Sequence, residues 1–264
     1  MAEYTFFTNP MSRGQIARWA LHEAGAEYDP VLIDFAAPHP QLDAANPMRK
    51  VPTIVHHAVG GDRTISEAAA ICAYLADAHP GAELAPRETE RADYYRWMFF
   101  AAGPVEQAIV AKAMGWEVPQ GREGMVGFGS LDRVLDALEG LLDDREWVCG
   151  ERFTMADVYV GSQVDWGLAF GSMPSRAAFV AYAERFRERD AFKTAKAIDN
   201  ALIEQMKKCA APKTSSACGT TGPPRTPQLS TPRHFPIATS VRSIVPQVTI
   251  PAANKAMSSP WNLP

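Results

Sequence analysis

The chain has few cysteines, and their spacing argues against two kinds of site. None of the four forms a Cys-x-x-Cys pair or a spacing typical of metal ligands. Disulfide frameworks and zinc sites need such spacing. We therefore expect buried or incidental thiols in a reducing cytoplasm, and no metal site.

Long apolar runs and a surplus of basic residues are also missing. No run approaches the roughly 18 apolar residues that span a bilayer, and the start Met-Ala-Glu has no basic segment followed by an apolar one. The formal net charge is −4, whereas nucleic-acid-binding domains normally carry a basic stripe. We expect a cytoplasmic protein that binds neither membranes nor nucleic acid.

Acidic residues are absent after Glu204, where the composition changes. Residues 210–264 hold ten of the 21 prolines, many Ser and Thr, and no sustained apolar period. Such a composition buries too little apolar surface to offset chain entropy. We predict that residues 209–264 form a disordered tail outside the catalytic unit. A docking segment, another functional tail and an artefact of gene structure stay open, and we assign the tail no function.

Strand and helix patterns alternate in the first 80 residues. Residues at helical spacing up to Gly25 predict a first helix, and Gly60-Gly61-Asp62 predicts a hairpin turn. The predicted strands are Tyr4–Thr8, Val31–Phe35, Thr53–His56 and Arg63–Ile65, and the last helix is Glu67–Ala78. This order of elements is typical of a thioredoxin-like α/β domain, which we place at residues 1–80.

After a linker at residues 81–87, the apolar residues follow a helical period only. The predicted helices are Glu88–Met114, Met125–Leu142, Met155–Ala169, Arg176–Arg189 and Phe192–Lys208. The fold class is therefore an α/β N-terminal thioredoxin-like domain followed by an all-α helical bundle domain at residues 88–208.

Val51-Pro52 is the first candidate binding element. A proline that opens a strand is often only an edge residue. A cis X-Pro bond would instead turn the chain and leave the amide and carbonyl of Val51 free to pair with an extended peptide. Both interpretations fit the sequence.

Ser66-Glu67-Ala68 is the second candidate. With Ser66 as N-cap and Glu67 in the first turn, the motif would simply stabilise a helix. Alternatively, the free amides at the helix start would bind a ligand carboxylate while Glu67 binds a ligand ammonium. A γ-glutamyl group carries both charges on one carbon.

The segment from Asn9 to Arg13 is the third candidate. Asn9 as N-cap and Pro10 at the first helical position would start a helix, with Ser12 an ordinary first-turn residue. Alternatively, the Ser12 hydroxyl points at a ligand sulfur. A hydroxyl donor beside a helix N-terminus lowers the pKa of a thiol below its reference of about 8.5.

Together, these motifs resemble the cytosolic glutathione transferase superfamily, in its bacterial-type or theta-like, serine-type branch. Asn46-Pro-Met-Arg-Lys-Val-Pro is similar to the family's Asn-Pro-x-x-Lys-Val-Pro segment, whose proline is cis. Glu67-Ala-Ala-Ala-Ile-Cys-Ala-Tyr-Leu is similar to its Glu-Ser-x-Ala-Ile-x-x-Tyr-Leu helix. Phe153-Thr-Met-Ala-Asp-Val resembles its capping box, in which Thr154 and Asp157 are structural.

The resemblance implies a role for each candidate residue. Ser12 would stabilise the glutathione thiolate, and Val51, followed by Pro52, would pair with the cysteinyl backbone. Glu67 and the Ala68 amide would hold the γ-glutamyl end. The other implied glutathione-binding residues are Asn9 and Lys50, the latter for the glycine carboxylate.

A pocket for the electrophile would lie between the two domains. We expect its wall on the long helix, at Phe99, Phe100, Gly103 and Pro104, where small residues leave room beside apolar ones. An aromatic cluster on a long helix is more often part of the core, so this interpretation competes with a packing role.

The sequence departs from the family pattern at three points. Ala68 stands where Ser is usual, which removes a hydroxyl contact but keeps the amide. Arg49 stands where Gly is common, and either adds to the anion-binding charge or is merely solvated. Neither Tyr nor Cys occupies the first turn, which disfavours the tyrosine-type and the N-terminal-cysteine members.

The resemblance implies a homodimeric glutathione S-transferase with a role in detoxification. Glutathione would be a co-substrate whose thiolate attacks a small hydrophobic electrophile. Two alternatives stay open: a glutathione-dependent peroxidase or disulfide reductase on the same scaffold, and a non-catalytic binding protein that keeps the fold.

Overall fold

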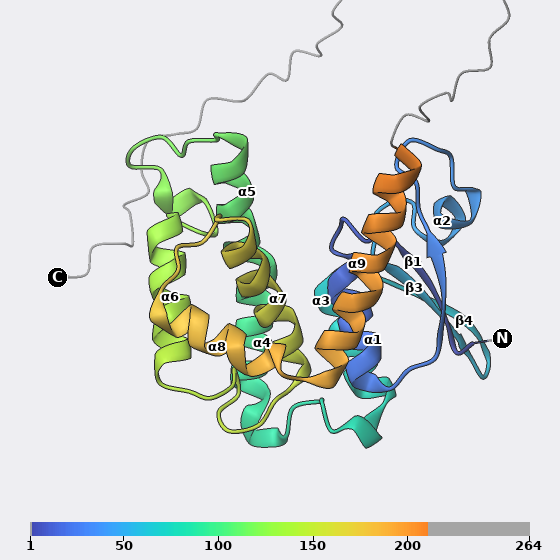
Figure 1. Cartoon of the computed structure of the whole chain (residues 1–264). Coiled ribbons are helices and arrows are strands. Elements are labelled where there is room, and N and C mark those ends of the chain that lie inside the picture. Colours follow the sequence, from blue (N-terminus) through green and yellow to red (C-terminus); the bar gives the residue numbers. More distant parts are fainter. Residues whose placement is uncertain (1, 211–264) are drawn as a thin grey trace, which may run out of the picture. The chain divides into compact units, whose positions relative to one another are not determined.

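A four-stranded mixed sheet forms the first part of the fold (Figure 1). The computed structural model of the chain describes residues 2–210. The strands are β1 (Tyr4–Thr8), β2 (Tyr28–Leu32), β3 (Thr53–Ala58) and β4 (Gly61–Ser66), in the spatial order β2-β1-β3-β4. β1 pairs in parallel with β2, and the other two pairings are antiparallel. The predicted thioredoxin-like domain is confirmed.

Side chains of β1 alternate between two cores, as the period of two in a strand requires. Tyr4 and Phe6 belong to the large core that also includes helices α1 (Gly14–Ala24) and α3 (Ala68–Ala78). Phe7 points to the opposite face, where it packs with Ile33 and with Leu42 of helix α2 (Pro40–Ala45). The end of β1 is therefore packed against a core on each face of the sheet.

Several predicted boundaries in this domain were wrong, those of the second strand and the first helix most clearly. The second strand begins at Tyr28 rather than Val31 and contains Pro30. Because β2 is the edge of the sheet, a residue without an N–H group is tolerated there.

The predicted helix start at Asn9-Pro10 was also wrong. Helix α1 begins only at Gly14, with Arg13 at the N-cap, and ends at the left-handed Gly25 as expected. Asn9 to Arg13 form a turn instead, because the carbonyl of Asn9 accepts from the amide of Ser12 at 3.1 Å.

The rest of the described chain is helical, which confirms the second predicted domain. Its α-helices are α4 (Arg91–Phe100), α5 (Glu106–Met114), α6 (Leu131–Asp143), α7 (Met155–Ala169), α8 (Ala177–Arg187) and α9 (Asp190–Ala210). α7 is buried along most of its length and packs against α1, α3, α4 and α8. α9 returns to the first domain and lies along α1 (Figure 1).

The predicted continuous helix Glu88–Met114 is interrupted. A short 3-10 turn (Glu88–Glu90) precedes α4, and a π-helical turn (Ala101–Val105) separates α4 from α5. This π-turn contains Pro104, which has no N–H group and whose ring collides with a carbonyl four residues earlier in a regular α-helix. The wider turn accommodates the proline.

The start of α6 also differs from the prediction of Met125. A 3-10 turn (Glu123–Met125) comes first, Gly129 adopts a φ of 62°, and α6 starts at Leu131. The hydroxyl of Ser130 caps the helix by accepting from the Arg133 amide at 3.3 Å. A further 3-10 turn (Pro80–Ala82) lies at the predicted linker.

The predicted capping box of α7 is confirmed. The Asp157 carboxylate is fully buried and accepts from the Thr154 amide and the Val148 amide, each at 2.8 Å. The Tyr182 hydroxyl donates to it at 3.0 Å from α8. Asp157 therefore joins two helices and the loop before α7.

The predicted tail at residues 209–264 falls almost entirely outside the described residues. Across residues 2–210, no helix has both the length and the apolar character needed to cross a membrane.

Candidate functional site

One row of the sheet brings the three candidate segments to the same end of the domain. Thr53 of β3 pairs with Phe7 of β1 on one side and with Ser66 of β4 on the other. β1 ends one residue beyond this row, β4 ends in it, and β3 begins there. Three segments therefore leave the sheet at the same end of its strands: the turn with Ser12, the Val51-Pro52 segment and the start of α3.

The turn before α1 is held by Asn9. Its side chain is 2% exposed; the amide group donates to the Ile33 carbonyl at 2.9 Å, and its oxygen accepts from the Met11 amide at 2.8 Å. The side chain thus fixes the turn from inside. A direct contact between Asn9 and glutathione stays a prediction.

Ser12 lies at the half-buried surface of this turn. Its hydroxyl donates to the Asn9 carbonyl at 2.7 Å and accepts from the Gly14 amide at 3.0 Å. Oγ therefore sits beside the N-terminal amides of α1, where the helix dipole favours negative charge.

Gly14 permits this close approach. A Cβ atom at Gly14 would lie 2.1 Å from Oγ1 of Thr8 and 3.2 Å from Oγ of Ser12. No side chain fits there without moving the end of β1 or the turn.

The loop before β3 is organised by two buried side chains. Asn46 donates to Oγ1 of Thr53 at 3.0 Å, and that hydroxyl donates to the Lys50 carbonyl at 2.9 Å. The Val51-Pro52 bond is cis, as the resemblance implied. Within the described residues, the amide and carbonyl of Val51 form no hydrogen bond with the protein, so they are available to an extended ligand.

The start of α3 differs from a simple capped helix. Glu67, not Ser66, occupies the N-cap, with a φ of 66° and no capping bond from its side chain. Its side chain is exposed, while Ala68 is buried at the first helical position. The first amides of a helix lack partners in the helix itself, and here they lie beside a free carboxylate.

Two basic residues lie within the loop before β3. Lys50 is exposed and forms no ion pair within the described residues. Arg49 adopts a φ of 55° and pairs with Asp43 at 3.1 Å. The left-handed backbone explains why glycine suits that position.

An ion pair that the sequence analysis missed joins the turn to the helical domain. Arg13, next to Ser12, contacts Glu106 of α5 at 2.6 Å, and Glu106 accepts from Gln163 of α7 at 3.3 Å. These residues are far apart in the sequence and follow no local pattern, so a single sequence gives no signal for the contact.

A small cavity adjoins this ion pair. It measures about 110 Å³ and has apolar walls from α5, α7 and the segment after α7, with Arg13 at one side. Its apolar lining includes Ile109, Val110, Trp166 and Phe170. The predicted wall residues do not line it: Phe99 is 67% exposed, Phe100 packs against Trp97, and Gly103 and Pro104 lie in the π-turn. Whether these four contact a substrate stays a prediction.

Metal ligands do not gather anywhere in residues 2–210. No group of three or more His, Cys, Asp or Glu side chains has an arrangement that could hold a metal ion there.

Two family models match the chain. The N-terminal domain of glutathione S-transferases matches residues 2–77, and their C-terminal domain matches residues 101–166. Glutathione S-transferase 1 of Schizosaccharomyces pombe is 30% identical over 182 residues, which cover 63% of this chain and 75% of the relative. A glutathione S-transferase of Escherichia coli O157:H7 is 25% identical over 69% of this chain and 92% of its own length.

Solved structures of glutathione transferases are also similar to this chain. A sphingomonad glutathione S-transferase complexed with glutathione has a TM-score of 0.60 and 27% identity, covering 74% of this chain and 98% of its own. A glutathione transferase of Phanerochaete chrysosporium in complex with oxidized glutathione shares the fold, with a TM-score of 0.63 and 21% identity over 76% of this chain and 98% of its own. From its two domains, its cis-proline loop and these relatives, the chain belongs to the glutathione S-transferase superfamily.

Proposed function

We propose that the protein is a serine-type glutathione S-transferase that activates the glutathione thiol for attack on a small hydrophobic electrophile. The single observation that supports this most is the shared row at Phe7, Thr53 and Ser66. At this end of the sheet lie the Ser12 hydroxyl, the unpaired backbone of Val51 and the N-terminus of α3 with the Glu67 carboxylate.

Glutathione is an extended tripeptide, and each part matches one of these segments. The free amide and carbonyl of Val51 pair with its cysteinyl backbone, as a strand does when it adds to a sheet edge. The amides that start α3 receive the γ-glutamyl carboxylate, and Glu67 binds the ammonium group. Lys50 is placed on the same loop as Val51 and binds the glycine carboxylate.

Ser12 is the group we assign to thiol activation. Its hydroxyl turns from the Asn9 carbonyl to the ligand sulfur when glutathione binds. The Asn9 carbonyl keeps a partner, because it also accepts from the Ser12 amide at 3.1 Å. The Gly14 amide continues to donate to Oγ, which makes the hydroxyl a better donor to the thiolate.

The cavity beside Arg13 is where we place the reactive part of the electrophile. It is bounded by the turn that carries Ser12, and its walls are mainly apolar. A volume of about 110 Å³ suits a small group rather than a whole drug-sized molecule. This is the basis for a small hydrophobic substrate.

The test is the ultraviolet absorbance of the thiolate of bound glutathione, titrated against pH. We expect the thiol of the bound tripeptide to ionise well below its free pKa in the wild-type protein. Ser12→Ala returns the bound pKa toward the free value and lowers turnover by about two to three orders of magnitude, as loss of one donor to a developing anion does, while glutathione still binds. Ser175→Ala, at an exposed serine of the helical domain, is the control. Unchanged turnover in Ser12→Ala would exclude this role.

A non-catalytic glutathione-binding protein is the second candidate. It is favoured by Ala68, which lacks the usual hydroxyl, and by the two bonds that already occupy the Ser12 hydroxyl. Glutathione that binds with an unshifted thiol would support it. A shifted thiol with turnover of a hydroperoxide but not of an aryl halide would indicate the peroxidase alternative.

A cytoplasmic homodimer is part of the proposal. Tyr95 and Phe99 lie four residues apart on α4, hence on one face, and are 46% and 67% exposed. Such a pair of uncovered aromatic side chains fits a contact between subunits. Sedimentation of wild type and Phe99→Glu tests this. A variant that stays dimeric but loses affinity for the electrophile would assign Phe99 to the substrate pocket instead.

A further inference from the structure

A chain of hydrogen bonds crosses three strands of the sheet near the hairpin between β3 and β4. Oγ1 of Thr5 on β1 lies 2.9 Å from Nε2 of His57 on β3. Nδ1 of the same ring lies 2.9 Å from Oδ1 of Asp62 on β4. A hydroxyl, an imidazole and a carboxylate are thus joined in the order found in acyl-transferring enzymes, an arrangement that is recognised by geometry and not by sequence position.

The strand register places these three side chains on one face of the sheet. Thr5 is two residues from Phe7, and His57 is two residues from Val55, so each pair shares a face. Phe7 and Val55 both belong to the small core on the side of α2. Asp62 pairs directly with His57. The hydrogen bonds therefore lie on the side of α2, away from α1 and α3.

The Asp62 carboxylate fixes the tautomer of the neutral His57 ring. An ionised carboxylate only accepts hydrogen bonds, so Nδ1 carries the ring proton and Nε2 has a free lone pair. The Thr5 hydroxyl then donates to Nε2. The ring is oriented to take a proton from this hydroxyl, which is the role of a general base.

A groove of about 530 Å³ adjoins the three residues, all of which line it. Small-molecule sites have volumes of about 300–1,000 Å³. Neither Lys nor Arg is found among the described residues of the lining, whereas Asp29 and Asp62 are both present. The charge of the groove therefore disfavours anionic substrates. Its apolar lining includes Phe7, Val31, Ala45 and Val55.

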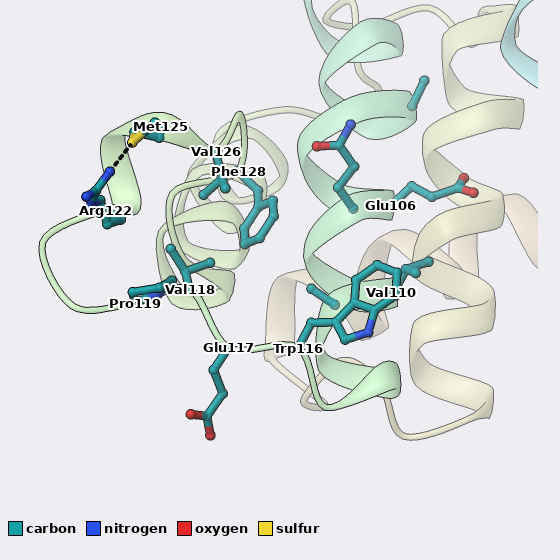
Figure 2. Close-up of a pocket in the computed structure, with 13 residues that line it drawn as sticks. Glu106, Val110, Trp116, Glu117, Val118, Pro119, Arg122, Met125, Val126 and Phe128 are labelled. Carbon is teal, nitrogen blue, oxygen red and sulfur yellow. Dashed lines mark hydrogen bonds between the residues drawn. The ribbon is translucent and has the colours of Figure 1, made fainter. Parts of the chain in front are cut away.

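The groove is separate from the sites already proposed. A cavity of about 900 Å³ between α5 and the segment that leads to α6 (Figure 2) shares Glu106 and Val110 with the cavity beside Arg13. Both cavities therefore belong to the region proposed for the electrophile. The groove on the sheet has no lining residue in common with either of them, and its lining includes neither Ser12 nor Val51.

We propose that this groove is a second catalytic site, which hydrolyses small uncharged esters with short acyl groups. Oγ1 of Thr5 attacks the carbonyl carbon as its proton passes to Nε2 of His57. The bond to the alcohol breaks, the leaving alcohol takes that proton, and the acyl group stays on Thr5. Water then adds to this ester and gives a proton to His57. The carboxylic acid leaves, and the proton returns to Oγ1.

Two further side chains support these steps. Asp62 is a positioning residue, because it holds the ring and does not touch the ester. Gln41 of α2 lines the same groove and carries a side-chain amide that donates to the oxyanion. The reaction uses no glutathione, so the inference does not rest on the proposed transferase activity.

The test is hydrolysis of p-nitrophenyl acetate by the full-length protein, dialysed free of glutathione. We expect turnover above that of buffer and an acetyl group on Thr5, located by mass spectrometry after an acid quench. Thr5→Val keeps the branched shape and the strand preference and reduces turnover to that of buffer. Thr5→Ser keeps the hydroxyl and the activity.

Two more variants test the ring and its partner. His57→Gln lowers kcat by about 10²-fold or more, which is the usual contribution of a general base. Asp62→Asn lowers kcat and leaves KM unchanged. Thr89→Val, at an exposed position before α4, is the control and keeps wild-type turnover. Circular dichroism verifies that all the variants fold.

Three results would overturn the inference. Wild-type turnover equal to that of buffer would exclude an ester site. Equal turnover in Thr5→Val and wild type would exclude the hydroxyl as nucleophile. An acetyl group on the imidazole of His57 in place of Thr5 would show that the ring itself attacks the ester.

Discussion

Arg18 and Asp199 form an ion pair in which both side chains are 1% exposed, with 2.9 Å between Nε and Oδ1. Arg18 belongs to α1 and Asp199 to α9, so the contact joins the thioredoxin-like domain to the last described helix. Arg18 also donates to the Tyr28 hydroxyl at 2.9 Å. The Asp199 carboxylate and the Tyr28 hydroxyl therefore compensate the buried guanidinium.

Removing one member of this pair should destabilise the fold strongly. Asp199→Ala leaves the buried guanidinium uncompensated, a change that costs about 3–5 kcal/mol. Urea denaturation measures the loss. Asn200→Ala, at an exposed position of the same helix, should change stability by less than about 0.5 kcal/mol. The combined change Arg18→Met with Asp199→Leu should recover most of the loss. A loss below about 1 kcal/mol in Asp199→Ala would show that water reaches the pair.

Gly14 should not tolerate a methyl group. In Gly14→Ala, the new Cβ collides with Oγ1 of Thr8 and displaces the turn that carries Ser12. Overpacking of this kind costs about 1–3 kcal/mol, and turnover should fall with it. Thermal denaturation and kinetics with an aryl halide measure both effects.

Two companion variants make this prediction specific. Adding Thr8→Ala to Gly14→Ala removes the colliding atom and should restore stability. Gly140→Ala in α6 has open space around the new methyl and should gain about 0.5–1 kcal/mol from helix propensity alone. If Gly14→Ala were as stable as Gly140→Ala, the close contact would be relieved by a small shift.

The stability contributed by Asp157 should fall as pH rises. Burial raises the pKa of this carboxyl to about 6, despite the donors that lower it. In the unfolded chain the pKa is about 3.9. The folded state therefore holds its proton more tightly, and this contribution is fully present below pH 4 and lost between about pH 4 and 6.

The comparison with Asp157→Asn isolates this effect, because Asn does not titrate. The difference in unfolding free energy between wild type and variant should shrink by about 2 kcal/mol from pH 4 to pH 7. Urea denaturation at several pH values measures it. A difference that grows over the same interval would mean that the four donors hold the carboxylate ionised throughout.

The Arg13–Glu106 contact should matter little for stability. The two side chains are 45% and 24% exposed, and exposed pairs contribute about 0.2–1 kcal/mol. A double-mutant cycle with Arg13→Ala and Glu106→Ala should give a coupling energy in that range, whereas the KM for the electrophile should rise in both single variants. Coupling above about 2 kcal/mol would instead identify the pair as a main link between the domains.

Local patterns predicted most of the fold. β1 and α7 are rich in residues typical of their element type and are bounded by clear end signals, and both have the expected bounds. Propensity alone could not show the π-turn, which depends on how the helix accommodates Pro104. The start of α6 could have been found, because Ser130 after Gly129 is a helix start signal.

The site was less predictable than the fold. Motif resemblance identified Ser12, Val51 and Glu67 as candidates, and the strand register brings their segments together. The contact of Arg13 with Glu106 depends on tertiary packing between residues far apart in the sequence. It leaves no periodic signal in a single sequence.

The row through Thr53 constrains how this chain can change its length during evolution. A one-residue insertion in β3 would move its side chains to the opposite face of the sheet. It would also displace Val51 relative to the turn at Ser12. The segment between α5 and α6 has no such register, so insertions and deletions can accumulate there. Differences in length among close relatives should therefore fall in this segment, while the spacing between Ser12 and Val51 stays constant.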